Sequence, residues 1–107
     1  MKNVLIICAG GMSSSVLAKK TTETLKEQGN DIQVEATSTN EGREMIEKAK
    51  YDLYLVSPQT KMYYDQLKKT GERSGKPVVS IPPQAYVPVP MGIKKLSQLI
   101  LQELPES

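Results

Sequence analysis

The chain has 107 residues, with 14 Lys and Arg against 12 Asp and Glu, a single cysteine and no histidine. This length suits one compact domain, residues 1–107, and the interspersed charges form no basic arm for nucleic acid. One cysteine without histidine excludes an internal disulfide, a Cys/His zinc site and the hydrolases that activate Ser or Cys through histidine. We therefore expect a cytoplasmic protein that uses neither a metal nor a cofactor.

The first expected element is a strand over Asn3 to Cys8. Its apolar residues 4–7 are continuous, as in a central parallel strand that is buried on both faces. This run is too short for a signal peptide or a membrane span, so we expect no direct membrane insertion. A helix is predicted over Ser13 to Gln28, with Gly29 at its end.

The rest of the chain repeats this alternation. Three more strands are expected over residues 32–36, 51–56 and 76–81, and three more helices over residues 41–50, 59–69 and 92–103. This order predicts an open doubly wound α/β domain with a four-stranded parallel sheet flanked by helices. The apolar helix residues expected to face the sheet are Val16, Leu17, Leu25, Met45, Ile46, Ala49, Met62, Tyr63, Leu67, Ile93, Leu96, Leu99 and Ile100.

The most informative segment joins the first strand to the first helix. In doubly wound sheets, ligands bind beyond the carboxyl ends of the strands, where the strand order reverses, and Cys8 is expected at such an end. Gly10 and Gly11 permit a tight turn, so that successive backbone N–H groups can point inward and bind a phosphate at the helix N-terminus. The hydroxyls that could cap the helix or donate to phosphate are those of Ser13, Ser14 and Ser15.

The same surroundings favour a reactive Cys8. Helix N-termini and converging N–H donors stabilise a thiolate over a thiol, so this cysteine can be activated without histidine. A thiolate aimed at a bound phosphate is a nucleophile for phosphoryl transfer. The pattern is also typical of a cysteine that is only a small buried side chain beside a turn, and a binding module without catalysis stays open.

A cysteine phosphatase of the low-molecular-weight type is the alternative enzyme. Its loop requires an arginine six residues after the cysteine, but that position holds Ser14. Among possible general acids, Asp52 begins the third expected strand at the opposite end of the sheet, and Asp65 falls within a helix. The segment is therefore better suited to hold a phosphoryl group than to hydrolyse it.

The chain resembles the enzyme IIB component of the phosphoenolpyruvate-dependent sugar phosphotransferase system, in the lactose/cellobiose/chitobiose family. The resemblance covers essentially the whole chain and rests on the Cys8 to Ser15 loop, the turn at residues 57–59 and Tyr86 after the fourth strand. It differs at Ala9-Gly10-Gly11, where the family commonly has Ser before a single Gly, and at Val87 to Pro90, where the family often has glycines.

The resemblance implies a fold similar to the low-molecular-weight tyrosine phosphatases and a role for Cys8 as the phosphorylated residue. Cys8 would be loaded from a histidine of the IIA component and unloaded onto a disaccharide of the cellobiose or chitobiose type at the membrane component IIC. The backbone amides that would hold the phosphate are those of Ala9, Gly10, Gly11, Met12, Ser13, Ser14 and Ser15.

Three side chains are candidates for contact with these partners. Met12 is apolar in a polar loop, Gln59 follows Pro58 in the turn after the third strand, and Tyr86 lies on a loop expected near the strand ends. Packing inside the fold is the alternative for Met12, and helix capping for Gln59. Because both partners would bind one face in turn, a monomer is expected.

Overall fold

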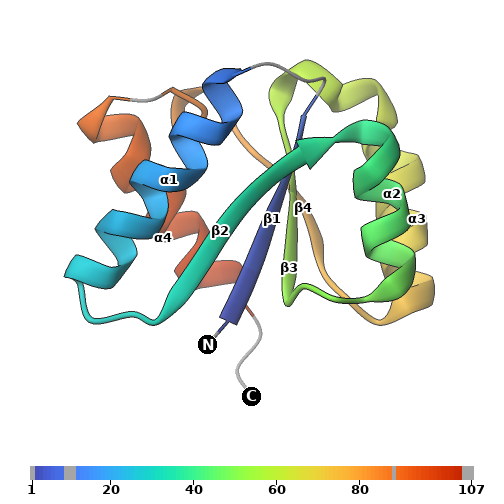
Figure 1. Ribbon diagram of the computed structural model, residues 1–107. Coiled ribbons are helices and arrows are strands. Elements are labelled where there is room, and N and C mark those ends of the chain that lie inside the picture. The colour runs from blue at the N-terminus through green and yellow to red at the C-terminus, as the bar shows by residue number, and fades with distance from the viewer. Residues whose placement is uncertain (1, 9–11, 88, 105–107) are drawn as a thin grey trace.

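The computed structural model describes residues 2–8, 12–87 and 89–104, and for residues 12–14 and Gln59 it describes the backbone alone. A four-stranded parallel sheet in the order β2-β1-β3-β4 forms the centre (Figure 1). The strands are β1 (Lys2–Cys8), β2 (Ile32–Ser38), β3 (Leu53–Val56) and β4 (Val78–Ser80). β1 pairs with β2 on one side and β3 on the other, so the strand order reverses beside β1, which confirms the expected architecture.

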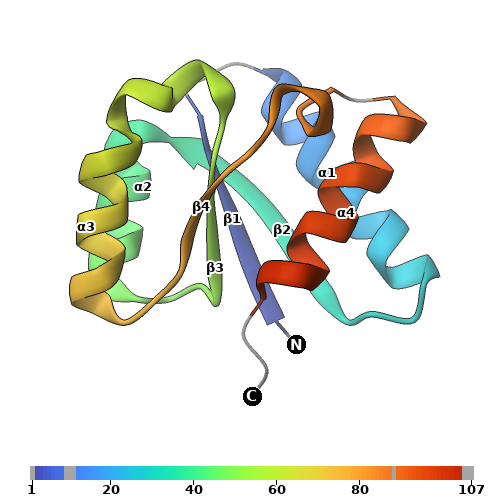
Figure 2. The same cartoon turned by 180° about the vertical axis from the view of Figure 1, so that it is seen from behind.

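Two pairs of helices cover the sheet. The helices α1 (Met12–Glu27) and α4 (Pro90–Glu103) lie on one face, and α2 (Thr39–Lys48) and α3 (Tyr64–Ser74) lie on the other (Figures 1 and 2). Two short 3₁₀ helices, η1 (Pro58–Tyr63) and η2 (Pro83–Ala85), follow β3 and β4. Gly75 ends α3 with a φ of 73°, a left-handed conformation that glycine adopts without steric cost.

β1 forms the middle of the core and is covered on both faces. Val4 and Ile6 pack in the cluster under α1 and α4, whereas Leu5 and Ile7 pack in the cluster under α2 and α3. All four side chains are at most 2% exposed. The continuous apolar run of this strand is therefore explained by helices on both sides of a central strand.

The segment after β3 contradicts the predicted helix over 59–69. Residues 58–63 form a 3₁₀ helix with a break at Thr60 (φ −110°, ψ 23°), and α3 begins only at Tyr64. Three residues per turn in place of 3.6 move Met62 and Tyr63 off the face that Leu67 occupies. Their side chains are 79% and 43% exposed, so the prediction that they face the sheet is wrong.

One residue of α1 also departs from the predicted pattern. Val16 is 44% exposed, while the neighbouring Leu17 and Ala18 are buried. The buried stripe of this helix continues through two threonines, Thr21 and Thr22, that the apolar pattern does not reveal. Thr22 is satisfied there because its hydroxyl donates to Ala18 O at 2.9 Å and accepts from Val34 N at 2.9 Å.

Two tyrosines, one just before β3 and one within it, predict a pH dependence of stability. Burial and a 2.7 Å hydrogen bond to Glu35 Oε2 raise the pKa of Tyr51 to about 12. Burial also raises the pKa of Tyr54, whose hydroxyl donates to Met45 O. Between about pH 10 and about pH 12 the folded chain keeps phenol protons that the unfolded chain has released, so the free energy of unfolding falls as pH rises.

Urea unfolding at several pH values from about 9 to about 11.5 checks this expectation. The variant Tyr51→Phe should show a shallower fall than the unchanged chain. Equal slopes for the two proteins would contradict the assignment to Tyr51.

Candidate active site

Cys8 is the last residue of β1, at the carboxyl edge of the sheet. It pairs with Ser38 at the end of β2, and Ile7 before it pairs with Val56 at the end of β3. The side chain is 1% exposed, and its Sγ donates to Thr37 O at 3.5 Å. Cys8 therefore lies beside the reversal of strand order, with its sulfur turned toward β2.

Hydroxyl groups from two neighbouring segments hold the end of β1. Thr60 Oγ1 lies 3.1 Å from both Ser57 Oγ and Ser57 O and 3.4 Å from Ile7 O, and the backbone N of Ser57 donates to Ile7 O at 2.9 Å. On the other side, Thr39 Oγ1 donates to Cys8 O at 3.3 Å. These bonds fix the backbone on both sides of the Cys8 side chain.

The expected phosphate loop is described only in part. Ala9, Gly10 and Gly11 lie outside the described residues, so the nest of amides stays a prediction. Helix α1 begins at Met12, which places its N-terminus at the Cys8 edge, where the helix dipole favours an anion. The side chains of Met12, Ser13 and Ser14 also lie outside the description, and Ser15 is exposed in the first turn.

The two other expected contact residues lie at the same edge. Gln59 is in η1, with its side chain outside the description. Tyr86 follows η2 and is half-buried, because it packs against the core cluster under α1 and α4. Part of the Tyr86 side chain thus packs on the core, and its contact with a partner stays a prediction.

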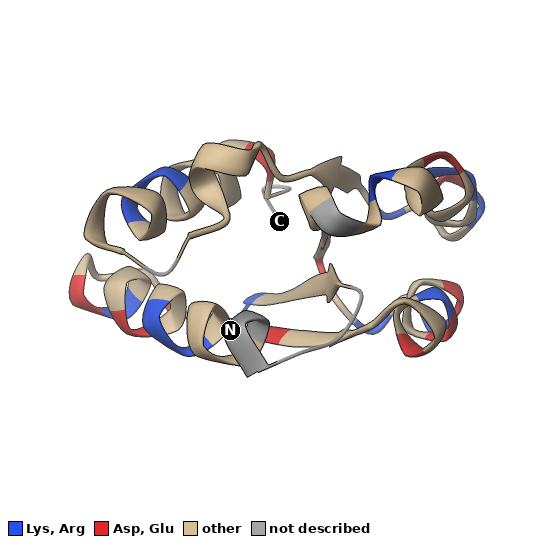
Figure 3. Cartoon of the chain, turned by 90° about the horizontal axis from the view of Figure 1, so that it is seen from above, with Lys and Arg blue, Asp and Glu red and all other residues tan. Residues whose placement is uncertain are grey.

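Sequence reasoning missed a group of exposed apolar side chains toward the edge of the sheet where Cys8 lies. Apart from Leu101 near the end of α4, all exposed large apolar residues that the structure describes lie in segments that follow the carboxyl ends of strands. Most charged residues, in contrast, lie along the helices (Figure 3). The sequence signals Val87, Val89 and Met91 by their place in a proline-rich segment, but it gives no such signal for the others. The group consists of Val16, Met62, Tyr63, Val87, Val89 and Met91.

Each carboxylate considered as a general acid has a structural explanation for its position. Asp52 precedes β3 at the opposite edge, where its Oδ2 accepts from Asn3 N at 2.8 Å. Asp65 is in the first turn of α3, a position that the helix dipole favours. Among the described residues, no three His, Cys, Asp or Glu side chains gather as a metal site would require.

The family of this chain follows from comparison with known proteins. Residues 3–100 match the family described as "PTS system, Lactose/Cellobiose specific IIB subunit". The chain belongs to this IIB family. Its members are phosphotransferase components of sugar transport, which confirms the resemblance drawn from the Cys8 loop.

Two relatives of similar length are separate IIB chains. The oligo-β-mannoside-specific EIIB component of Bacillus subtilis is 30% identical over 80% of this chain and 82% of its own length. The cellobiose-specific EIIB component of Lactococcus lactis is 31% identical over 79% of this chain and 82% of its own length. The IIB family therefore includes chains of this size named for different sugars.

Other relatives join IIB to IIC in one polypeptide. The lactose-specific EIICB component of Streptococcus mutans is 32% identical over 68% of this chain, and the matched part is 12% of that protein. This fusion supports IIC as a partner of the IIB family. In the part of the chain that the structure describes, no helix is long and apolar enough to cross a membrane.

Solved structures confirm the fold. The lactose-specific IIB domain of Streptococcus pneumoniae superposes with a TM-score of 0.81 at 24% identity, over 95% of this chain and 96% of that one. The cellobiose-specific IIB component of Borrelia burgdorferi superposes with a TM-score of 0.72 at 24% identity, over 96% of this chain and 91% of that one. The α/β architecture of the IIB family is thus the architecture of this chain.

Proposed function

We propose that Cys8 is a phosphoryl carrier between the IIA and IIC components of a sugar transport system. The observation that supports this most strongly is the place of Cys8, at the end of a central strand and beside the reversal of strand order, four residues before α1 begins. The chain holds no other cysteine and no histidine. Cys8 is therefore its one thiol nucleophile, and no imidazole can carry the phosphoryl group in its place.

Two transfers make up the proposed cycle. The Cys8 thiolate attacks the phosphorus of phosphohistidine on IIA, an S–P bond forms, the N–P bond breaks, and the histidine takes up a proton. A sugar hydroxyl at IIC then attacks the same phosphorus, loses its proton, and the S–P bond breaks to return the thiolate. The sugar would be a disaccharide of the cellobiose or chitobiose type, and one relative is named for cellobiose.

The buried sulfur adds a condition to the first transfer. Cys8 is 1% exposed and its Sγ donates to Thr37 O, so the sulfur must lose this hydrogen bond and turn outward before it can reach phosphorus. The exposed apolar group at this edge, defined above, is suited to dock the two partners in turn, because apolar contact area excludes water from the transfer. We place the protein in the cytoplasm as a single-domain monomer.

The proposal is tested by transfer of labelled phosphate. Incubation with labelled phospho-IIA should label the chain, and subsequent addition of membranes with IIC and a β-linked disaccharide should remove the label to sugar phosphate. Hydrolysis of p-nitrophenyl phosphate should be negligible, because Ser14 stands where a phosphatase needs arginine. Rapid hydrolysis of that ester, with no labelling from phospho-IIA, would support the phosphatase alternative and contradict the carrier.

A further inference from the structure

A polar groove runs between α2 and α3, on the face of the sheet opposite α1 and α4. It consists of two hollows of about 380 Å³ and about 240 Å³ that share Arg43 and Gln66. We call it the α2–α3 groove and define it by its lining residues, which are Ser38, Thr39, Asn40, Arg43, Tyr63, Gln66, Leu67, Lys69, Thr70 and Arg73.

The charge of this groove has one sign. Its lining contains three cations, Arg43, Lys69 and Arg73, and no carboxylate. The chain as a whole is nearly balanced, with 14 cationic against 12 acidic side chains, so this lining is more positive than the average surface. The two acidic residues of α3, Asp65 and Glu72, do not line the groove. The groove is therefore complementary to an anion.

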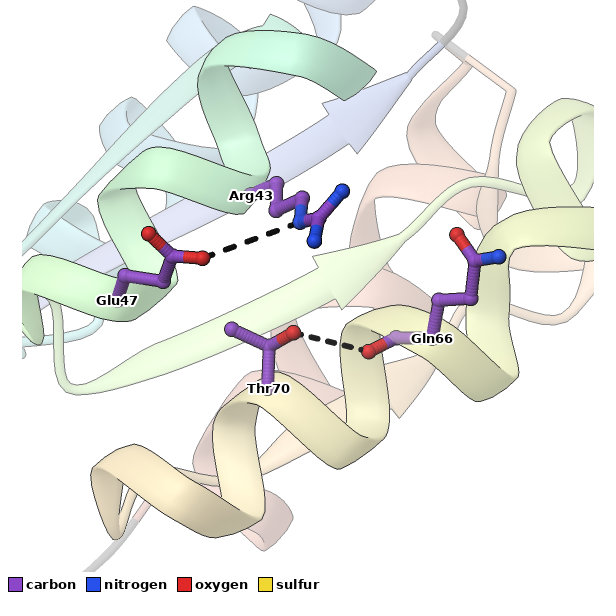
Figure 4. A network of polar contacts seen from close by, with 4 residues as sticks. All are labelled: Arg43, Glu47, Gln66 and Thr70. Atoms are coloured by element: carbon purple, nitrogen blue, oxygen red, sulfur yellow. Dashed lines mark hydrogen bonds and ion pairs between the residues drawn. The ribbon is translucent and has the colours of Figure 1, made fainter.

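Arg43 keeps part of its guanidinium available for an anion. Its Nε lies 3.8 Å from Glu47 Oε1, an ion pair between two exposed side chains that contributes little to stability. The terminal nitrogens point away from Glu47, and the Gln66 side chain lies on the other side of the groove from them (Figure 4). This fork can bind a carboxylate through two parallel hydrogen bonds.

The groove opens onto the Cys8 edge of the sheet. The larger hollow, of about 380 Å³, is lined by Thr39 and by the exposed Tyr63 of η1. The hydroxyl of Thr39 donates to Cys8 O at 3.3 Å. From there the lining continues along α3 from Gln66 to Arg73, a distance of about 10 Å at 1.5 Å per residue. A partner seated over Cys8 thus has a continuous path into the groove.

The dimensions favour a polypeptide over a small anion. The cations come from two helices and all three line the smaller hollow, where Lys69 and Arg73 are separated by about 6 Å along α3. A small anion held there would leave the hollow of about 380 Å³ empty, whereas about four to five residues of extended chain reach through both hollows from Tyr63 to Arg73. An acidic segment would therefore satisfy the whole lining.

Charge also decides between the two partners that visit Cys8. Cytoplasmic loops of membrane proteins carry an excess of Lys and Arg, which a basic groove repels. We propose that the α2–α3 groove binds an acidic segment of the soluble protein that delivers the phosphoryl group, the IIA component. This inference rests on the function proposed above. The groove would speed association with IIA and favour IIA over other partners, because charge complementarity at protein interfaces raises association rates and specificity.

The test measures binding of purified IIA separately from transfer. The variant Lys69→Glu/Arg73→Glu should weaken binding of IIA about tenfold at low salt, measured by calorimetry, and the difference should shrink as salt is added. The matched control is Lys94→Glu/Lys95→Glu on α4, which makes the same change in net charge on the opposite face and should alter binding less than about twofold. Thermal unfolding of both variants checks that they are folded.

The outcomes separate this inference from the proposed function. If IIA binds and the groove variant binds weakly, the inference stands, whether or not Cys8 becomes labelled. Equal binding of IIA by the groove variant and the control overturns it. Selective loss of binding to vesicles with anionic lipids, with IIA binding unchanged, also overturns it and assigns the groove to a membrane surface.

Discussion

Replacing Cys8 by serine or alanine should abolish acceptance of phosphate from phospho-IIA. Cys8 is the one thiol of the chain, and loss of a nucleophile costs enzymes about a thousandfold or more in rate. A serine hydroxyl at this position has nearly the same shape and can still donate to Thr37 O, so the fold should be kept. The measurement is labelling of the purified variants with phospho-IIA, compared with the unchanged chain.

Binding provides the control for these variants. Cys8→Ser should still bind IIA with nearly unchanged affinity, because the side chain is buried and contributes little contact surface. Labelling of Cys8→Ala at a rate near that of the unchanged chain would show that another residue carries the phosphoryl group.

Removing the hydroxyl of Thr60 should destabilise the fold by about 2 kcal/mol. Thr60 is 1% exposed, and Thr60→Val preserves its shape while leaving the buried Ser57 hydroxyl without its 3.1 Å partner. The bond to Ile7 O, just before the cysteine, is lost as well. We therefore expect lower stability in urea unfolding and slower phosphoryl acceptance by Cys8.

A half-buried threonine serves as the comparison. Thr24 also carries a hydroxyl bond, from Oγ1 to Lys20 O at 3.0 Å, but this bond is exposed to solvent. Thr24→Val should change the free energy of unfolding by less than about 0.5 kcal/mol. Equal effects of the two substitutions would contradict a specific role for the hydroxyl network at the end of β1.

The order of elements was predictable because the spacing of apolar residues differs clearly between the strands and the helices of this chain. The uninterrupted apolar run in β1 requires cover on both faces, and repeated alternation of strand and helix leads to a parallel sheet. The prediction was wrong at Met62 and Tyr63, since a 3₁₀ turn and an α-helix share short-range apolar spacing. The backbone conformation of residues 58–63, which breaks at Thr60, distinguishes the 3₁₀ helix from an α-helix.

The candidate site was predictable where its residues are local in sequence. Cys8 stands before a pair of glycines and a run of serines, so its place at a strand end could be inferred without coordinates. Thr39 and Thr60 could not be found in this way, because their bonds to the end of β1 depend on strand pairing across 31 and 53 residues. The α2–α3 groove depends likewise on how two distant helices pack.

The most direct test of the central claim is to locate the phosphoryl group. The chain is phosphorylated by phospho-IIA, digested near neutral pH, and its peptides are sequenced by tandem mass spectrometry. The account predicts a phosphoryl group on the sulfur of Cys8. Phosphate on one of the loop serines, Ser13, Ser14 or Ser15, with Cys8 unmodified, would contradict it.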